Sequence, residues 1–231
     1  MIKVGAAAIN QTPLDWFGNK TRIIQVIEEA KDLGIQILCL PELAITGYGC
    51  EDAFLSPDIF RKSLESLDEI VDKTGNIITC IGLPLSIRNK TYNTVAVVAN
   101  RQILGFVCKQ HLPNYGLFYE DRWFNRWKQS KATEIRLNGF SYPVGDIIFN
   151  VSGINIGIEI CEDAWVAERP AIKHFEKGVD IILNPSASPF AFNKFKTREQ
   201  LVTDASRAFS CTYIYSNLLG NESGRLVFDG D

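Results

Sequence analysis

Three polar side chains that could act together on an amide each follow an apolar, strand-like run. Cys161 ends the run SGINIGIEIC, Glu42 follows ILCLP, and Lys109 follows ILGFVC. A thiol, a carboxylate and an amine are the groups that amide cleavage through a covalent intermediate requires. A lone buried cysteine at a strand end is more often inert packing, so the hypothesis needs all three residues.

A cysteine nucleophile needs a base, because a free thiol is mostly protonated at neutral pH. In this hypothesis Glu42 takes the proton from Cys161 and later one from water. Lys109 stabilises the negative charge that develops on the carbonyl oxygen of the substrate. The backbone N–H of Glu162, where the chain enters the next helix, is a second candidate donor to that oxygen.

Glu42 and Lys109 also have ordinary structural explanations. Glu42 could be a capping or surface carboxylate after Pro41, but a turn beyond a rigid strand is a usual place for catalytic groups. We expect its side chain in such an exposed turn. Lys109 could be a solvated lysine at a strand end, but it follows FVC, where a buried ammonium would be costly without a carboxylate partner.

Metal binding has little support in the sequence. No CxxC pair occurs, and His111 and His174 lie far apart along the chain. Glu159, Glu162 and Asp163 could bind a metal, which is a minor alternative on ligand chemistry. We expect no metal and no cofactor in this domain.

Short apolar runs alternate with longer segments of helical periodicity, and these elements must position the polar residues. The runs predict strands over 3–9, 35–40, 76–83, 94–99, 103–109, 146–150, 154–160, 180–184 and 212–216. The periodic segments predict helices over 19–33, 56–74, 165–177 and 194–209.

Several helix boundaries have capping residues. Asn19 is placed to cap the first helix and Gly34 to end it. Ser56 precedes Pro57 at the start of the second helix, and Gly178 closes the third. These residues therefore support the predicted helix limits.

The alternation of strands and helices predicts an α/β fold. Continuous apolar strings such as LCL, IIL and YIY predict strands that are buried on both faces. Asn100 and Arg101 separate two runs and predict a hairpin, so the sheet should be mixed. No linker is marked, so 1–231 is expected to be one domain. The ending GRLVFDGD reads as a strand entering a turn, which suggests that the chain is part of a longer polypeptide.

Composition limits the functional class. The 231 residues are 46% hydrophobic, enough for a sizeable core, and the formal net charge is only −3. No basic stripe favours nucleic acid, and no apolar stretch has the length of a signal peptide or membrane span, so we expect a cytoplasmic protein. Its cysteines are scattered singly, which predicts a reducing compartment without disulfides: Cys39, Cys50, Cys80, Cys108, Cys161 and Cys211.

The strings around the three polar residues resemble a known family. Glu, Lys and Cys in this order, each beyond a strand, are similar to the nitrilase, or carbon-nitrogen hydrolase, superfamily. The blocks LCLPELAITGYGCEDAFL, KQHLPNYGLFYEDRWF, IEICEDAW, LNPSASPF and LVFDG together resemble the glutaminase domain of glutamine-dependent NAD synthetases. The five blocks cover nearly the whole chain in the family's order. The resemblance implies an αββα sandwich with mixed sheets.

The resemblance also implies roles for individual residues. Glu42 would be the general base, Lys109 the electrostatic stabiliser, and Cys161 the nucleophile that forms a γ-glutamyl thioester. Glu120 in FYEDRWF matches a fourth polar residue that the superfamily places beside the triad.

Positions that bind glutamine in the family fall on Tyr115, Ser188 and Lys194. A pair of hydroxyls could hold the polar end of glutamine, and the Lys194 ammonium could pair with its α-carboxylate. Ordinary explanations are loop packing for Tyr115, a turn before Pro189 for Ser188, and a first-turn helix lysine for Lys194. The side chain of Glu162 has no assigned role.

Two segments depart from the family pattern. The second block reads FYED where an Asp usually follows the Phe, and NLLGNESGR differs from the expected Gly-Gln-Asp type of sequence. Neither departure changes Glu42, Lys109 or Cys161.

The implied function is hydrolysis of L-glutamine to glutamate, with delivery of ammonia to a synthetase domain in the same longer chain. That domain would use ATP and Mg to amidate deamido-NAD to NAD. No GxxxxGK[ST] or SGG-type loop occurs here, so we assign no nucleotide site to this chain. The family also suggests a homo-oligomer. Two alternatives are a free-standing amidase acting on another small amide and a non-catalytic assembly module of the same fold.

Overall fold

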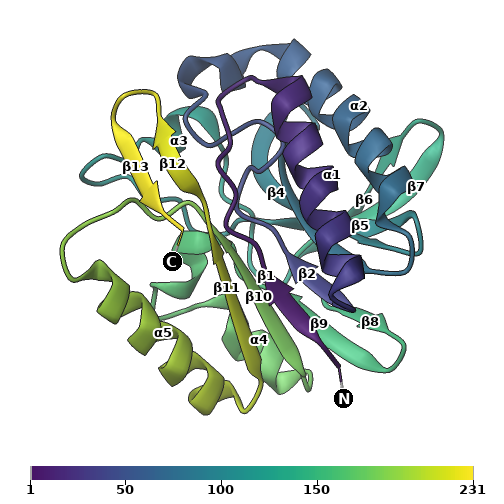
Figure 1. Ribbon diagram of the computed structural model, residues 1–231, viewed down its shortest axis with the longest axis vertical. Helices are drawn as coiled ribbons and strands as arrows, with labels where there is room; N and C mark the ends of the chain where they lie inside the picture. Colours follow the sequence, from purple (N-terminus) through teal and green to yellow (C-terminus); the bar gives the residue numbers. More distant parts are fainter. Residues whose placement is uncertain (1, 231) are drawn as a thin grey trace.

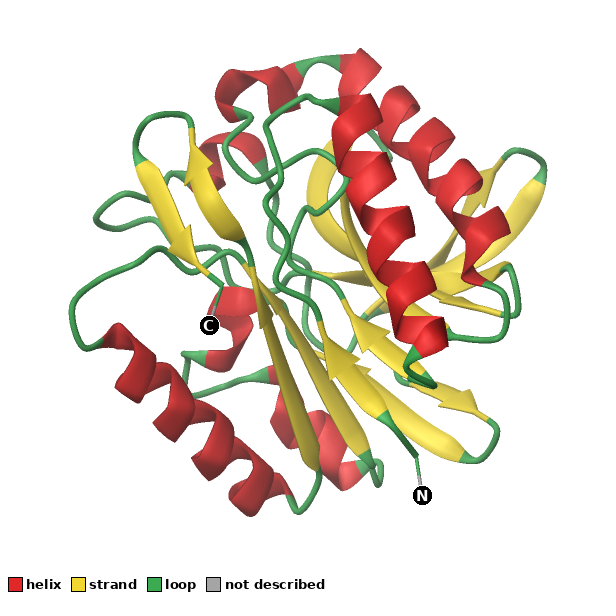
Figure 2. Ribbon diagram, in the orientation of Figure 1, coloured by secondary structure: helices red, strands yellow, loops and turns green. Residues whose placement is uncertain are grey.

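Two β-sheets pack face to face, and a pair of helices covers the outer face of each sheet (Figures 1 and 2). The structure is a computed structural model, and it describes residues 2–230. The four layers form an αββα sandwich, as the family resemblance implied.

Seven strands within residues 2–230 form the larger sheet: β1 (Val4–Ala6), β2 (Ile37–Cys39), β3 (Ile78–Ile87), β4 (Lys90–Ala99), β5 (Gln102–Cys108), β6 (Ala132–Leu137) and β7 (Phe140–Gly145). Their spatial order is β1-β2-β3-β4-β5-β7-β6. β1, β2 and β3 run parallel, whereas β4 is antiparallel to both β3 and β5. The predicted mixed sheet and the β4–β5 hairpin are therefore confirmed. Asn100 and Arg101 both have positive φ, as a tight two-residue hairpin turn requires.

The smaller sheet has the order β11-β10-β9-β8. Its strands in the described chain are β8 (Phe149–Val151), β9 (Ile154–Ile158), β10 (Ile181–Ser186) and β11 (Thr212–Asn217). β9, β10 and β11 are parallel, and β8 pairs with β9 as an antiparallel edge. A separate hairpin of β12 (Leu219–Glu222) and β13 (Leu226–Asp229) follows β11.

Helices α1 (Trp16–Asp32) and α2 (Pro57–Thr74) cover the larger sheet, while α4 (Pro170–Glu176) and α5 (Lys194–Phe209) cover the smaller one (Figure 1). Three short helices lie in the connections: η1 (Glu51–Leu55), α3 (Glu120–Trp123) and η2 (Cys161–Ala164).

The central strands are apolar throughout because they face a packed layer on each side. In β10, Ile181 and Leu183 pack against the larger sheet, whereas Ile182 packs under α4 and α5. All three side chains are buried. Burying a side chain of this size stabilises the fold by roughly 1.5–3 kcal/mol relative to leaving it exposed. The continuous IIL string is thus explained by two-sided burial, as predicted.

The predicted start of the first helix was wrong. α1 begins at Trp16 because the Asp15 carboxylate accepts a hydrogen bond from the Gly18 N–H at 2.9 Å. Asn19 lies inside the helix, where its buried amide donates to the carbonyls of Thr12 and Ile45. Ser56 does occupy the capping position of α2, but its side chain makes no capping bond.

The helix predicted over 165–177 is much shorter than expected. Cys161–Ala164 forms the short helix η2, and α4 begins only at Pro170. The intervening Arg169 reaches back to Glu159, with Nε 3.0 Å from Oε1. Arg169 has extended backbone and precedes Pro170, the first residue of α4, so the helix begins there and not at Trp165.

The sequence pattern also missed parts of three hairpins. β3 and β4 extend beyond the predicted 76–83 and 94–99 to a turn at Arg88 and Asn89, both with positive φ. The β6–β7 hairpin was not predicted, because exposed and half-buried residues alternate along β6 with little apolar content. The strand predicted at the end of the chain is present as β13, and its unpredicted partner is β12.

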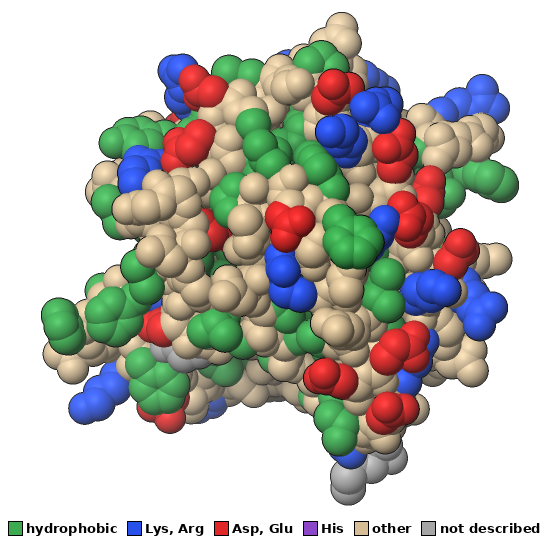
Figure 3. Space-filling view, turned by 45° about the horizontal axis from the view of Figure 1, so that its top comes forward, with side chains coloured by type: hydrophobic (Ala, Val, Ile, Leu, Met, Phe, Trp, Pro, Cys, Tyr) green, Lys and Arg blue, Asp and Glu red, His purple; other side chains and the backbone are tan. Residues whose placement is uncertain are grey.

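Charged side chains of both signs are interspersed over the face shown in Figure 3, and neither sign dominates it. Within residues 2–230, no helix has the length and apolar character needed to cross a membrane.

Candidate active site

The ends of strands from the two sheets meet at one end of the sandwich. Glu42 follows β2, and its backbone N–H donates to the carbonyl of Ser186, the last residue of β10, at 3.3 Å. Cys161 follows β9, the neighbour of β10 in the smaller sheet. Lys109 follows β5 and joins the larger-sheet side of the group. Residues far apart in sequence therefore converge at the contact between the sheets.

The Glu42 side chain is fully buried, so the prediction of an exposed turn was wrong. Apolar residues of the covering loops exclude water from the loop after β2, among them Leu43 and Phe54. The Glu42 Oε1 accepts hydrogen bonds from Lys109 Nζ at 2.6 Å and from Asn93 Nδ2 at 2.7 Å. Its Oε2 is buried and has no partner among the described residues. One oxygen is thus anchored, and the other is free to take a proton.

Lys109 is a fully buried ammonium with two carboxylate partners. Its Nζ lies 2.6 Å from Glu42 Oε1 and 2.8 Å from Glu120 Oε1. Burial opposes its charge, but Glu120 and Glu42 together hold the Lys109 pKa well above its usual value. The lysine therefore stays charged, as the cost of an unpaired buried ammonium had suggested.

Glu120 sits on the other side of Lys109. Its Oε1 also accepts a hydrogen bond from the Tyr48 hydroxyl at 2.6 Å. Burial and the nearby Glu42 raise the Glu120 pKa to about 7, although Lys109 and Tyr48 act in the opposite direction. One ammonium shared by two carboxylates leaves this group able to bind a further proton near neutral pH.

Cys161 opens η2 with φ of 47°, in the left-handed region that a residue with a Cβ rarely adopts. Such strain is common where a side chain must be presented to a ligand. Burial raises the pKa of its thiol, and Glu42 adds to this effect, whereas Lys109 and the Ala187 N–H lower it. The resting group is therefore a thiol within the electrostatic reach of Glu42 and Lys109, and it needs a base to become a nucleophile.

Asp163 ties two of the strand ends together. Its Oδ1 accepts from the backbone N–H groups of Gln110 at 3.0 Å and His111 at 2.7 Å. Its Oδ2 accepts from the Ile160 N–H at 3.0 Å. One buried carboxylate thus joins the residues that follow Lys109 to the residue that precedes Cys161.

The three predicted glutamine-binding residues occupy different surroundings. Tyr115 is 60% exposed, and its hydroxyl donates to Glu162 Oε2 at 3.0 Å. Ser188 is buried, and its Oγ accepts from Arg198 Nε at 3.3 Å. Lys194 donates to the carbonyl of Pro189 at 3.0 Å. Each of the three polar groups has a protein partner in this structure, and their binding of glutamine stays a prediction.

The alternative metal ligands are already engaged. Glu159 is paired with Arg169 and accepts from the Tyr213 hydroxyl at 2.9 Å. Asp163 accepts the three backbone donors described above, and Glu162 accepts from Tyr115. Across residues 2–230, no group of three or more His, Cys, Asp or Glu side chains is arranged to hold a metal ion.

The sequence patterns gave no role to Tyr48 and Asn93, and they suggested Asp163 only as a possible metal ligand. Tyr48 and Asp163 lie inside the family-like blocks GYGCEDAFL and IEICEDAW, but Asn93 lies outside them, in the strand KTYNTVAVVA. A polar residue such as Asn93 in the middle of a buried strand was the available signal, since buried polar groups require partners.

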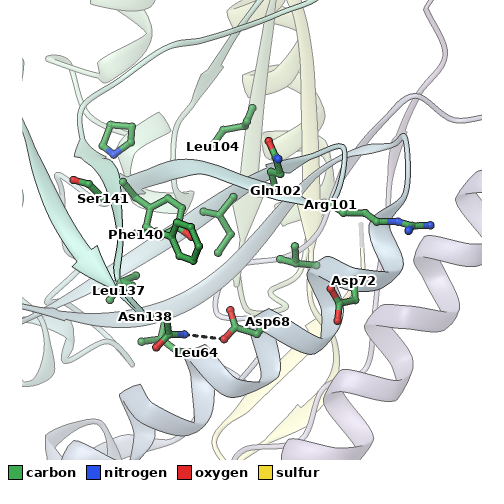
Figure 4. A pocket seen from close by; sticks show the side chains of 14 residues that line it. Leu64, Asp68, Asp72, Arg101, Gln102, Leu104, Leu137, Asn138, Phe140 and Ser141 are labelled. Carbon is green, nitrogen blue, oxygen red and sulfur yellow. Dashed lines mark hydrogen bonds between the residues drawn. The ribbon is translucent and has the colours of Figure 1, made fainter.

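A cavity of about 640 Å³ lies elsewhere, between α2, the start of β5 and the β6–β7 hairpin (Figure 4). Arg101 and Gln102 line it, together with Asp68, whose carboxylate accepts from Asn138 Nδ2 at 3.0 Å. Lys109 follows the opposite end of β5, roughly 20 Å away at the usual rise of a strand. This cavity is therefore separate from the group around Cys161.

The sequence was compared with protein-family models and with curated proteins. The family model described as Carbon-nitrogen hydrolase matches residues 3–231. A glutamine-dependent NAD(+) synthetase of Mus musculus is 35% identical over 99% of this chain and 33% of its own length. The chain thus spans about a third of the curated relatives it matches.

Solved structures agree with the observed fold. The crystal structure of a glutamine-dependent NAD(+) synthetase from Cytophaga hutchinsonii superposes with a TM-score of 0.94 at 48% identity, covering 99% of this chain and 38% of that one. An amidase from Nesterenkonia sp. has a TM-score of 0.79 at 21% identity, with 98% and 79% of the two chains covered. The second likeness extends to the fold alone.

Proposed function

The chain belongs to the carbon-nitrogen hydrolase family, and we propose that it hydrolyses the side-chain amide of glutamine through a thioester on Cys161. The observation that carries the proposal is the buried Lys109 ammonium, held between Glu42 and Glu120 and within electrostatic reach of the thiol. A cation fixed in a site closed to water stabilises charge that develops in a transition state far better than a solvated one.

In the first half of the reaction, Glu42 Oε2 takes the proton from the Cys161 thiol. The sulfur attacks the side-chain carbonyl carbon of glutamine, and the carbonyl oxygen gains negative charge. Lys109 and the backbone N–H of Glu162 stabilise that oxygen. The C–N bond then breaks as Glu42 returns its proton to the leaving nitrogen, so ammonia departs and a γ-glutamyl thioester remains.

In the second half, water gives a proton to Glu42 and its oxygen attacks the thioester carbon. The C–S bond breaks, the proton returns to the sulfur, and glutamate is released. The same oxygen of Glu42 therefore serves twice. This role is supported by the anchoring of Oε1 through Lys109 and Asn93, which leaves Oε2 without a partner among the described residues.

Glutamine would be held by Tyr115, Ser188 and Lys194. Lys194 would exchange its bond to the Pro189 carbonyl for the α-carboxylate of glutamine, a stronger charge-assisted pairing. The exposed ring of Tyr115 would form part of the entrance beside Glu162. The relatives are glutamine-dependent NAD(+) synthetases, which supports this choice of amide.

The ammonia would serve ATP-dependent amidation of deamido-NAD in a synthetase domain. ATP, Mg and deamido-NAD would bind that domain and not this one. The relatives are about three times longer than the region they share with this chain, which supports its place as the N-terminal part of a longer protein.

A comparison of substrates tests the proposed function. Purified protein should release ammonia from glutamine faster than from a simple aliphatic amide, and a glutamine-mimicking electrophile should label Cys161 before the other five cysteines. A preference for the plain amide would identify a free-standing amidase. Absence of both hydrolysis and labelling would favour a non-catalytic module.

A further inference from the structure

Arg198 on α5 is the largest fully buried side chain among the described residues, and it is charged. A guanidinium is costly to bury unless its donors are paired. Its Nη1 lies 2.9 and 3.1 Å from the two oxygens of Asp229. Its Nη2 donates to the carbonyls of Ser188 and Pro189, each at 2.9 Å. Arg198 is thus bound both to β13 and to the loop that follows β10.

Asn217, at the end of β11, holds the same loop from another side. Its Oδ1 accepts from the Ser188 N–H at 2.8 Å, and its Nδ2 donates to the Ser188 carbonyl at 3.0 Å. The same Nδ2 also lies 3.3 Å from Asp229 Oδ1. Both backbone groups of Ser188 are therefore fixed by side chains from other elements.

The segment 186–189 touches both of the residues that carry the proposed chemistry. The Ser186 carbonyl accepts from the backbone N–H of Glu42 at 3.3 Å. Ala187 is fully buried, and its backbone N–H is close enough to the Cys161 sulfur to lower the pKa of that thiol. A displacement of this segment would therefore move groups that contact the base and the nucleophile at once.

We propose that Arg198, Asn217 and Asp229 form a bracket that holds segment 186–189 against Glu42 and Cys161, which makes Arg198 a positioning residue for the nucleophile. The bracket draws one side chain from each of α5, β11 and β13. The inference rests on the proposed function where the test measures glutamine hydrolysis. The alkylation rate of Cys161 tests the bracket without that assumption. Small misplacements of reacting groups cost rate steeply.

The test uses Arg198→Lys and Asn217→Ser in the full chain, with Arg22→Lys as the matched control. Arg198→Lys keeps the charge but loses the planar fork that binds Asp229 and two carbonyls together. Asn217→Ser leaves the Arg198–Asp229 pair in place. It removes the two bonds to Ser188 and the longer contact with Asp229 Oδ1. Arg22 is also a multiply bonded arginine, with partners Asp15 and Asn19 at the start of α1.

Two experiments are carried out at one pH. The first measures kcat and KM for glutamine. The second measures the rate at which iodoacetamide alkylates Cys161, followed on its peptide by mass spectrometry. Both bracket variants should lower kcat by about tenfold or more and change the alkylation rate. Arg22→Lys should lower the melting temperature at most. Parental kcat and parental alkylation rates in the folded Asn217→Ser variant would overturn the bracket.

The two proposals fail in different ways. If the parent protein does not hydrolyse glutamine, the proposed function is wrong, and the alkylation rates alone then decide the bracket. If the parent hydrolyses glutamine and the bracket variants match it in both readouts, only the bracket is wrong. Should Arg198→Lys fail to fold, Asn217→Ser decides, because it keeps the buried ion pair.

Discussion

Lys109 Nζ lies 2.6 Å from Glu42 Oε1, and neither side chain is exposed to solvent. The lysine leaves β5 and the glutamate follows β2, so the pair joins two strands that are not neighbours in the sheet. Glu120 adds a second carboxylate to the same ammonium. This buried charge cluster is the basis of the predictions that follow.

Removal of the ammonium should damage both stability and activity. Lys109→Met leaves Glu42 and Glu120 buried without their cation, and breaking a buried pair in this way typically costs about 3–5 kcal/mol. Glutamine hydrolysis should fall by at least about 10²-fold. Urea unfolding and ammonia release would measure the two effects. Lys20→Met is the control, because its surface pair with Glu69 should contribute at most about 1 kcal/mol.

The buried carboxyls predict a loss of stability as the pH rises. Burial raises the pKa of Glu120 to about 7 from 4.5, and burial raises those of Glu222 to about 7 and Asp163 to about 8. A carboxyl whose folded pKa is raised binds its proton more tightly when folded, so its contribution is complete below about pH 4 and is lost as the pH passes the folded value.

Glu120→Gln isolates one part of this pH dependence. The free energy of unfolding of the parent should decrease between about pH 5 and about pH 8. The variant should show a smaller decrease, because its amide does not titrate, although Asp163 and Glu222 still do. Equilibrium urea unfolding at the two pH values measures this. An equal decrease in parent and variant would show that Glu120 does not titrate in this range.

Asn93 should orient the proposed base. Asn93→Ala removes the donor that holds Glu42 Oε1 at 2.7 Å, so the carboxylate can rotate and Oε2 is no longer fixed. We expect kcat for glutamine to fall about tenfold with little change in KM. Thr94→Val is the matched control on the same buried strand, since it loses only a bond to the Leu83 carbonyl. Equal kcat values for the two variants would contradict the orienting role.

Asp163 should link the Lys109 and Cys161 strand ends. Asp163→Asn places an amide NH₂ where the carboxylate accepts backbone N–H groups, so at least one of the three donors loses its partner. A lower unfolding free energy by about 1–3 kcal/mol is expected, together with reduced kcat. Asp180→Asn, which alters a similar backbone bond to Asn155 at the opposite end of β9, should leave kcat unchanged. A normal kcat in Asp163→Asn would show that the link is structural only.

The residue patterns were sufficient for the α/β class and the mixed sheet, whereas the αββα layering was expected only from the family resemblance. Apolar runs such as IIL predicted strands buried on two faces, and Asn100–Arg101 predicted the hairpin that makes the larger sheet mixed. Strand burial and hairpin turns can be predicted in this way because both are determined by short stretches of consecutive residues.

Features that depend on distant partners could not be read from the sequence. The burial of Glu42 follows from a loop covered by Phe54 and other apolar residues. The late start of the helix predicted over 165–177 accompanies the pairing of Arg169 with Glu159. The bond from Asn93 to Glu42 spans 51 residues of chain, and the bond from Gln110 to Asp163 spans 53. The periodicity of neighbouring residues cannot predict contacts between residues so far apart in the sequence.

The central claim is that Cys161 carries a thioester during glutamine hydrolysis. The most direct test is acid quenching of the protein during turnover, followed by mass spectrometry of the peptide that contains residue 161. We expect a γ-glutamyl adduct on Cys161 and, in Cys161→Ala, a folded protein with neither the adduct nor ammonia release. Glutamine hydrolysis at the parental rate by Cys161→Ala would contradict it.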